Sequence, residues 1–326
     1  LPKLLWLKKH EPANYARIAA LALPKDFIRL QLTGTLGTDV GDASGMLLID
    51  PDRRTWHTAV CKAVGVDPAI LPPLTESACV VGTVTPWAAS QTGLKPGTPV
   101  VAGTGDNHAG AIGAGVAEPG MAVATLGTSG VIYVHSPQPR RDLGAATPPG
   151  RVMTMCAADG AAAAPGHWSI TGCTLSAAGS VQWARDVFAP EVPYATLYAE
   201  AAAVPRGCEG LVFLPYLSGE RCPHPDPLAR GAWIGLRAHH TRGHLIRAVM
   251  EGVTFTMAQM LEVIRALPVE VASVRLGGGG NKSALWRQMQ ADVYELPCAT
   301  VSNDEGPAFG AALLAGVSVG AWRSVR

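Results

Sequence analysis

The residue with the clearest potential for chemistry is an aspartate that follows an apolar segment. Residues 100–110 read VVAGTGDNHAG, so Asp106 stands between an expected strand, 99–103, and a helix rich in glycine and alanine. Ligands of open α/β sheets bind at the carboxyl ends of strands, and flanking glycines let a substrate approach the backbone. A carboxylate there can take a proton from a substrate hydroxyl. The alternative is that Asp106 only caps the helix, and Asp42 in the polar segment 38–45 presents the same choice, with a turn favoured.

Two glycine-containing loops are candidates for binding phosphate or nucleotide. Gly127, Thr128 and Ser129 occupy an expected hairpin turn, whose backbone N–H groups and hydroxyls suit phosphate oxygens. Residues 276–283, LGGGGNKS, join an expected strand to a helix that begins near Ser283, and a helix N-terminus favours anions. Neither GxxxxGK[ST] nor GxGxxG fits this loop. An ordinary turn and a simple strand-to-helix connection remain the alternatives.

Histidines and cysteines do not predict a metal site. His239, His240 and His244 have no acidic or cysteine neighbour in the sequence, so they indicate the exposed start of a helix. The seven cysteines form no CxxC pair, which argues against both a disulfide framework and a zinc cage. We therefore expect no protein-bound metal and a reducing, cytoplasmic location.

Composition limits the class of protein and its partners. The 326 residues suggest about two domains. Hydrophobic residues make up 48% and charged residues 16%, with a formal net charge of +1, which excludes a disordered chain and a binder of nucleic acid driven by charge. The longest uncharged stretch, 306–322, is too short for a membrane span and predicts a buried helix instead.

The elements that must position these residues follow from apolar spacing and turn formers. We expect helices within 3–34 and short strands at 46–49, 80–84 and 99–103. Between 115 and 120 the residue pattern changes from helical to strand-like, and we place the domain boundary there. A hairpin of 121–126 and 131–134 should follow. Helices are then expected at 174–188 and 241–266, a strand at 271–276, and further helices from 283 and from 307. Such alternation predicts mixed or parallel sheets covered by helices.

Read in order, these segments resemble the FGGY family of carbohydrate kinases over essentially the whole chain. Residues 2–10 (PKLLWLKKH) are similar to the back half of the family's first signature, and 231–251 match the second, with GAWIGL, HL and AVME correctly spaced. Segments 38–45, 174–183 and 216–224 are most similar to the members that phosphorylate D-xylulose.

The resemblance implies an actin/hexokinase-like fold with two α/β domains of ribonuclease-H type. Residues 1–117 would be the C-terminal part of the first, sugar-binding domain, whose opening strands and first phosphate loop are not in the sequence. Residues 118–326 would form the second, nucleotide-binding domain, shortened at its C-terminus. Activity of this chain alone is doubtful on that basis, and a homodimer is expected from the relatives.

The resemblance also assigns roles residue by residue. Asp106 would be the catalytic base and, with Asn107, would contact the sugar. ATP and Mg²⁺ would be the cofactors, and the nucleotide-binding positions would be Gly127, Thr128, Ser129, Ala178, Gly179, Gln182, Gly278, Gly279 and Ser283. The implied reaction is ATP-dependent phosphorylation of D-xylulose to D-xylulose 5-phosphate. The alternatives are a related kinase for ribulose, gluconate or glycerol, and an inactive remnant that only binds nucleotide.

Overall fold

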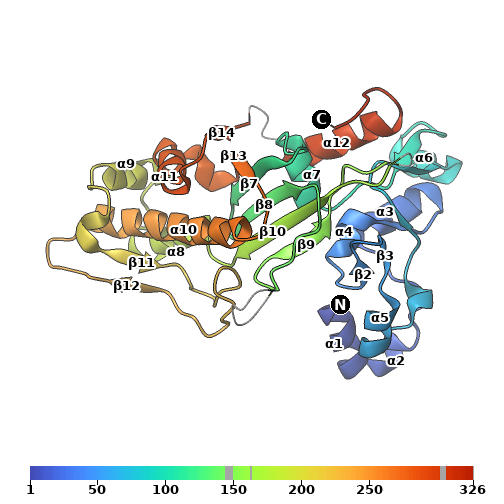
Figure 1. Cartoon of the computed structure of the whole chain (residues 1–326), viewed down its shortest axis with the longest axis horizontal. Helices are drawn as coiled ribbons and strands as arrows, with labels where there is room; N and C mark the ends of the chain where they lie inside the picture. Colours follow the sequence, from blue (N-terminus) through green and yellow to red (C-terminus); the bar gives the residue numbers. More distant parts are fainter. Residues whose placement is uncertain (144–149, 162–163, 302–305, 326) are drawn as a thin grey trace.

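The centre of the molecule is a mixed six-stranded β-sheet. The computed structural model describes residues 1–143, 150–161, 164–301 and 306–325. Across the sheet the strands are β14 (Cys298–Thr300), β13 (Val271–Gly277), β7 (Gly120–Leu126), β8 (Gly130–Ser136), β10 (Trp168–Thr174) and β9 (Met153–Cys156) (Figure 1). β13 runs parallel to both of its neighbours, whereas β7, β8, β10 and β9 form an antiparallel series. The hairpin, the strand at 271–276 and the mixed sheet are therefore confirmed.

Alternating residues of β7 and β8 face two different layers of helices. Ala122, Ala124 and Leu126 belong to the main core, while Val123 and Tyr133 belong to a separate cluster with residues of 111–116. This period of two is the geometry of a strand buried on both faces. The small side chains on the core face leave room for a long helix to pack closely.

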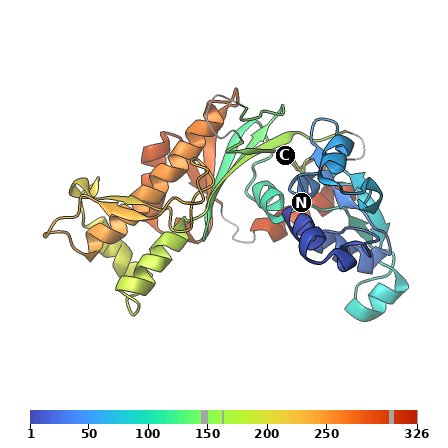
Figure 2. The ribbon, with the colours of Figure 1, turned by 90° about the horizontal axis from the view of Figure 1, so that it is seen from below.

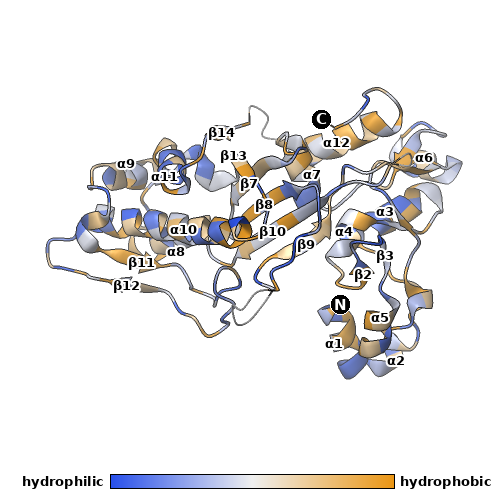
Figure 3. Cartoon of the chain, viewed as in Figure 1, coloured by the Kyte–Doolittle hydropathy of each residue, from blue (hydrophilic) through white to orange (hydrophobic). Residues whose placement is uncertain are grey.

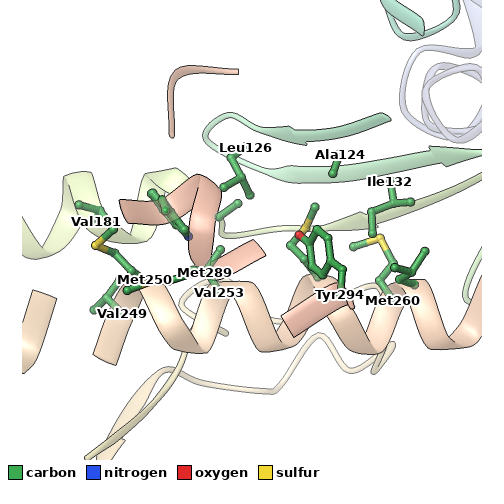
Figure 4. Close-up of a cluster of buried hydrophobic side chains, with 14 of the residues drawn as sticks. Ala124, Leu126, Ile132, Val181, Val249, Met250, Val253, Met260, Met289 and Tyr294 are labelled. Carbon is green, nitrogen blue, oxygen red and sulfur yellow. The ribbon is translucent and has the colours of Figure 1, made fainter. Parts of the chain in front are cut away.

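That long helix is α10 (Arg242–Arg265), which lies along the sheet and buries an apolar stripe against it (Figure 4). The expected helix at 241–266 is confirmed. Met250, Val253 and Met260 meet Leu126 and Ile132 of the hairpin in one buried cluster. Burial of each such side chain stabilises the fold by about 1.5–3 kcal/mol.

The other elements of this half surround α10. They are α8 (Ala178–Phe188), α9 (Tyr194–Ala202), η2 (Cys208–Gly210), β11 (Val212–Leu214), β12 (Ala232–Ile234), η3 (Gly279–Lys282) and α11 (Ala284–Tyr294). β11 and β12 pair as an antiparallel ribbon at the end of the molecule farthest from the N-terminus (Figure 1). The expected helix at 174–188 begins later than predicted, because β10 continues to Thr174.

The first part of the chain forms a separate group of short elements, on the opposite side of the sheet from α9 (Figure 2). They are α1 (Pro2–His10), α2 (Pro12–Tyr15), α3 (Pro24–Thr33), β1 (Thr38–Asp39), α4 (Val40–Ser44), β2 (Ile49–Asp50), β3 (Thr55–Trp56), α5 (Thr58–Val64), η1 (Pro68–Ile70), β4 (Leu74–Thr75), β5 (Val80–Thr83), α6 (Pro86–Thr92) and β6 (Pro99–Val101). Four of these α-helices, α1, α2, α3 and α6, start at a proline, as expected from its fixed φ and missing N–H.

Two expectations for this region are wrong. The expected strand at 46–49 is a turn, because Leu47 adopts a left-handed φ of 62°, and β2 starts only at Ile49. Segment 38–45, expected as a polar loop, forms β1 and α4 instead. The reason is that the Asp39 carboxylate accepts hydrogen bonds from the N–H groups of Gly41 and Asp42 and so caps a short helix.

Helices α7 (Asp106–Gly113) and α12 (Gly306–Ser318) pack against each other beside the sheet (Figure 1). A side chain at Gly310 would overlap the carbonyl oxygen of Ala109, and one at Gly113 would overlap that of Gly306. The backbones of the two helices are therefore in contact, and α12 fixes the position of α7, the helix that begins at Asp106.

α12 confirms the expected final helix but is buried on one face only, at Gly310, Leu314 and Gly316. Figure 3 shows it as largely apolar along its length. In the part of the chain that the structure describes, no helix combines the length and apolarity that crossing a membrane requires. All seven cysteines are free thiols.

Candidate active site

Asp106 lies where the sequence places it, after β6 and at the first position of α7. The residue in the capping position is Gly105, and the helix has no side-chain cap. The capping alternative is therefore wrong. The Asp106 carboxylate accepts a hydrogen bond of 2.8 Å from the N–H of Asn107 and is exposed, so it is available to a ligand.

A large cavity of about 580 Å³ opens beside Asp106, on the face of the sheet that carries α7. Its floor is formed by the carboxyl ends of parallel strands, at Thr125 of β7 and Gly277 of β13. Asp106 and Lys282 stand on its walls. Ligands of α/β sheets bind at this edge of a sheet, as the sequence pattern predicts.

The two glycine loops meet at one edge of this cavity. Gly278 has a φ of +86°, and a Cβ there would lie 2.6 Å from the carbonyl oxygen of Leu126, the last residue of β7. A Cβ at Gly280 would lie 2.9 Å from the Cβ of Leu126 and 3.3 Å from that of Ala178. Glycine is required here because three backbone segments come into contact.

The turn of Gly127, Thr128 and Ser129 is fastened to the start of α8. The Ala178 N–H donates to the carbonyl oxygen of Gly127 at 2.8 Å, and the Gly179 N–H donates to that of Thr128 at 3.3 Å. The structure therefore brings together the predicted turn, Ala178, Gly179, Gly278 and Gly279.

Gln182 and Ser283 are the remaining predicted nucleotide positions. Gln182 is exposed on α8, one turn beyond Ala178. Ser283 is buried and caps α11 by accepting a hydrogen bond from the Trp286 N–H at 3.4 Å, which confirms the helix start. Of the predicted nucleotide positions, all of which the structure describes, Gly278 and Gly279 line the large cavity. The other seven do not line it: Gly127, Thr128, Ser129, Ala178, Gly179, Gln182 and Ser283.

A smaller cavity of about 240 Å³ adjoins Asp106 from the other side. Asp106 and Asn107 line both cavities, so a group at Asp106 can touch one ligand in each. The smaller cavity also holds Asp42, Cys173 and Arg221. Arg221 was not singled out as a site residue, although it lies within segment 216–224.

Asp42 is the second carboxylate of the smaller cavity. A Cβ at Gly105 would lie 2.8 Å from its Oδ1, so the carboxylate packs against the backbone next to Asp106. Burial, reinforced by the negative charge of Asp39, raises the pKa of Asp42 to about 6. Lys25 opposes this shift, but its Nζ lies 4.0 Å away and is closer to Asp39, at 2.9 Å.

We predict that Asp42→Asn stabilises the protein more at pH 7 than at pH 4. A pKa raised from 3.8 to about 6 means that a neutral Asp42 stabilises the fold below pH 3.8, and that this contribution is lost as pH rises through 6. Asparagine does not titrate, so its advantage should grow by about 2 kcal/mol over this range. Urea unfolding at both pH values measures the difference. The exposed Asp186→Asn provides the control, and equal pH dependence in all three proteins would contradict the prediction.

His108, two residues after Asp106, also lines the smaller cavity. It is 2% exposed, its ring meets Tyr133 edge to face at 5.5 Å, and its Nε2 lies 3.5 Å from the Ser169 hydroxyl. Burial lowers its pKa, which disfavours a positive charge beside Asp106. The exposed Asp106 carboxylate is then left to ligands that enter the two cavities.

The histidine segment near α10 requires a correction. His239, His240 and His244 mark a helix start, as expected, but an acidic neighbour is present in space: Glu209 Oε2 lies 2.9 Å from His239 Nε2 and 3.5 Å from His244 Nε2. Glu209 is 30 residues away in the sequence, so spacing gave no signal of it.

Comparisons with known proteins identify this architecture. The model of the C-terminal domain of the FGGY family of carbohydrate kinases matches residues 122–319, and that of the N-terminal domain matches residues 1–113. The xylulose kinase of Bacillus subtilis strain 168 is 39% identical over 325 residues, which cover 100% of this chain and 63% of that protein.

Solved structures agree with the sequence matches. The xylulose kinase of Rhodospirillum rubrum has a TM-score of 0.85 at 33% identity, covering 98% of this chain and 62% of that one. The gluconate kinase of Lactobacillus acidophilus has a TM-score of 0.89 at 25% identity, covering 99% and 64%.

The mixed sheet with helices on both faces, continued into a second α/β group, is thus the actin-like fold of sugar kinases. The chain belongs to the FGGY family of carbohydrate kinases. It spans about 63% of the length of the B. subtilis relative.

Proposed function

We propose that the chain carries the catalytic aspartate and the nucleotide site of an ATP-dependent kinase that converts D-xylulose to D-xylulose 5-phosphate. The observation that carries the proposal is the position of Asp106, on the wall shared by the large and the smaller cavity. Similarity to xylulose kinases at 39% and 33% identity favours a ketopentose over the other substrates of the family.

In the proposed mechanism, ATP occupies the large cavity and the sugar the smaller one. The Asp106 carboxylate accepts the proton of the sugar hydroxyl while that oxygen bonds to the γ-phosphorus, and the bond from the γ-phosphorus to the bridging oxygen of ADP breaks. Asn107 orients the sugar through its amide. Gly127, Thr128 and Ser129 bind the phosphates, and Gly278 and Gly279 let the adenosine lie against bare backbone.

Mg²⁺ fits the oxygen donors of this site. It prefers one or two carboxylate or carbonyl oxygens together with water and substrate phosphates, and Asp106 and Asn107 offer such oxygens on the wall of the large cavity. When bound with ATP, the ion would neutralise charge on the transferred phosphoryl group.

The test is sugar-dependent ADP release by the 326-residue chain, with D-xylulose, D-ribulose, D-gluconate, glycerol and no sugar as parallel reactions, and with ATP binding measured by calorimetry. Turnover that is fastest with D-xylulose supports the proposal. Faster turnover with D-gluconate would favour the second candidate, a gluconate kinase, which the fold similarity at a TM-score of 0.89 motivates. ATP binding without turnover on any sugar would indicate a nucleotide-binding remnant.

Gly279 offers a direct test of the nucleotide site. A Cβ at this position would meet no atom within 4 Å, and the residue lines the large cavity. We predict that Gly279→Val leaves the melting temperature unchanged but weakens ATP binding at least about tenfold, because the side chain would occupy ligand space. Calorimetric titration measures the affinity.

Two further variants serve as comparisons for this prediction. Gly278→Val should lose both stability and affinity, since its Cβ would lie 2.6 Å from the Leu126 carbonyl oxygen. Ala312→Val, on an exposed part of α12, should change neither by much. Unaltered ATP affinity in Gly279→Val would remove the glycine loop from the nucleotide site.

The proposal also includes the division of the chain at 117/118, assembly into a homodimer and a cytoplasmic location. Free thiols at all seven cysteines favour a reducing compartment. Limited proteolysis and light scattering test the first two of these expectations.

A further inference from the structure

A second cluster of potential ligands lies outside the residues that line the two cavities. It consists of His135 on β8, Asp159 after β9 and His167 just before β10, which we call the His–Asp–His cluster. The His135 Nε2 lies 3.2 Å from Asp159 Oδ2, and the His167 Nδ1 lies 2.6 Å from the same oxygen. One ligand atom from each residue falls within 4.8 Å of the other two.

These spacings suit a small divalent transition-metal ion. Bonds of about 2.0–2.1 Å to nitrogen and oxygen in a tetrahedral zinc site place neighbouring ligand atoms about 3.3 Å apart. The distance from His135 to Asp159 already has this value. The distance from His167 to Asp159 is that of a hydrogen bond and would lengthen when an ion replaced the shared proton. A side-chain exposure of 31% at His167 leaves room for a water ligand.

The surroundings fix the orientation of the ligands. The side chain of Asp159 is 4% exposed, and that of His135 is 2% exposed. The Asp159 Oδ1 accepts a hydrogen bond of 2.8 Å from the His167 backbone N–H, and such a second partner fixes the orientation of a metal ligand.

Contacts from the first part of the chain fix the backbone at the cluster. The Arg54 guanidinium donates to the carbonyl oxygens of Gly166 and His167 and to both oxygens of Glu76, each of the latter at 3.0 Å. These contacts fix the backbone of His167, one of the three potential ligands.

The histidines near Glu209 are a weaker candidate, because the side chains of His239 and Glu209 are 53% and 45% exposed. In the His–Asp–His cluster, the side chains of His135 and Asp159 are only 2% and 4% exposed, so packing fixes their positions. The protons that His135 Nε2 and His167 Nδ1 share with Asp159 Oδ2 would be displaced by a bound ion.

We propose that His135, Asp159 and His167 form a binding site for one divalent transition-metal ion of the zinc class, with water completing the coordination. The ion would join β8 to the segment between β9 and β10, and would stabilise the place where that segment contacts the first part of the chain. This proposal does not depend on the kinase reaction.

The test uses the full chain after removal of metals with a chelator. Calorimetric titration with ZnCl₂ should detect a site with one ion per chain, and ZnCl₂ should raise the melting temperature. His167→Asn should weaken this binding at least tenfold and abolish the thermal shift, whereas His239→Asn, in the exposed histidine group, should change neither. Cobalt absorption should show nitrogen and oxygen ligands without thiolate charge transfer.

Two results would overturn the proposal. One is unchanged zinc affinity in His167→Asn, and the other is a loss of affinity in His239→Asn alone. Circular dichroism checks the fold of each variant. His167→Gln gives a second replacement at the same partly exposed position and should reproduce the loss.

Discussion

Asp106→Asn is expected to lower sugar-dependent ADP formation by about a thousandfold, within the 10²–10⁴-fold range that a positioned general base contributes. Asparagine has nearly the same shape but cannot take the hydroxyl proton. The Asp106 side chain is exposed and caps no helix, so the substitution should leave the melting temperature unchanged. ATP affinity should stay within about twofold, because the glycine loop and the turn at 127–129 bind the nucleotide in the proposed mechanism.

The measurement is a coupled ADP assay with D-xylulose, run beside ATP calorimetry on the same preparation. Asp186→Asn removes a carboxylate from an exposed part of α8 and should keep parental turnover. Asp42→Asn removes the other carboxylate of the smaller cavity and separates loss of the base from loss of cavity charge. Parental activity in Asp106→Asn would exclude Asp106 as the base.

The parts of the site that the sequence predicted are those built from local backbone. The turn at 127–129 and the loop at 277–280 depend on glycines whose neighbours along the chain already define a hairpin or a strand-to-helix connection. Asp106 follows a strand and begins a helix, a position that apolar spacing alone reveals. The family resemblance then predicted that these segments form one nucleotide and sugar site.

The parts that sequence reasoning missed depend on contacts between residues far apart in the chain. For Asp42 the sequence favours a turn over a site. Its position beside Gly105 follows from the packing of α4 against the start of α7, which the sequence does not reveal. The acidic partner of His239 is Glu209, and Asp159 is the shared partner of His135 and His167. No spacing rule connects such residues, since the loops between them set the distances.

The packing of α12 on α7 positions Asp106, the proposed catalytic base. α12 follows β14 in the chain but packs on α7, whose first residue is Asp106. Ser318 at its end also donates to the Ala78 carbonyl oxygen at 2.7 Å, so α12 binds to the first part of the chain at two places. A substitution that disrupts this contact should therefore lower the stability of the protein and also change the orientation of Asp106.

We expect Gly310→Val to reduce the free energy of unfolding by about 3 kcal/mol or more, since the new side chain would overlap the Ala109 carbonyl oxygen and push the helices apart. Ala312→Val places the same side chain on an exposed position of α12 and should cost only about 0.5 kcal/mol, the difference in helix propensity. Urea unfolding of both variants and the parent measures the two effects. Because the clash lies one turn from Asp106, Gly310→Val should also lose sugar-dependent turnover under conditions where circular dichroism shows it folded. Equal stability of the two variants would mean that α12 does not pack on α7 in solution, and Asp106 would then depend on β6 alone for its position.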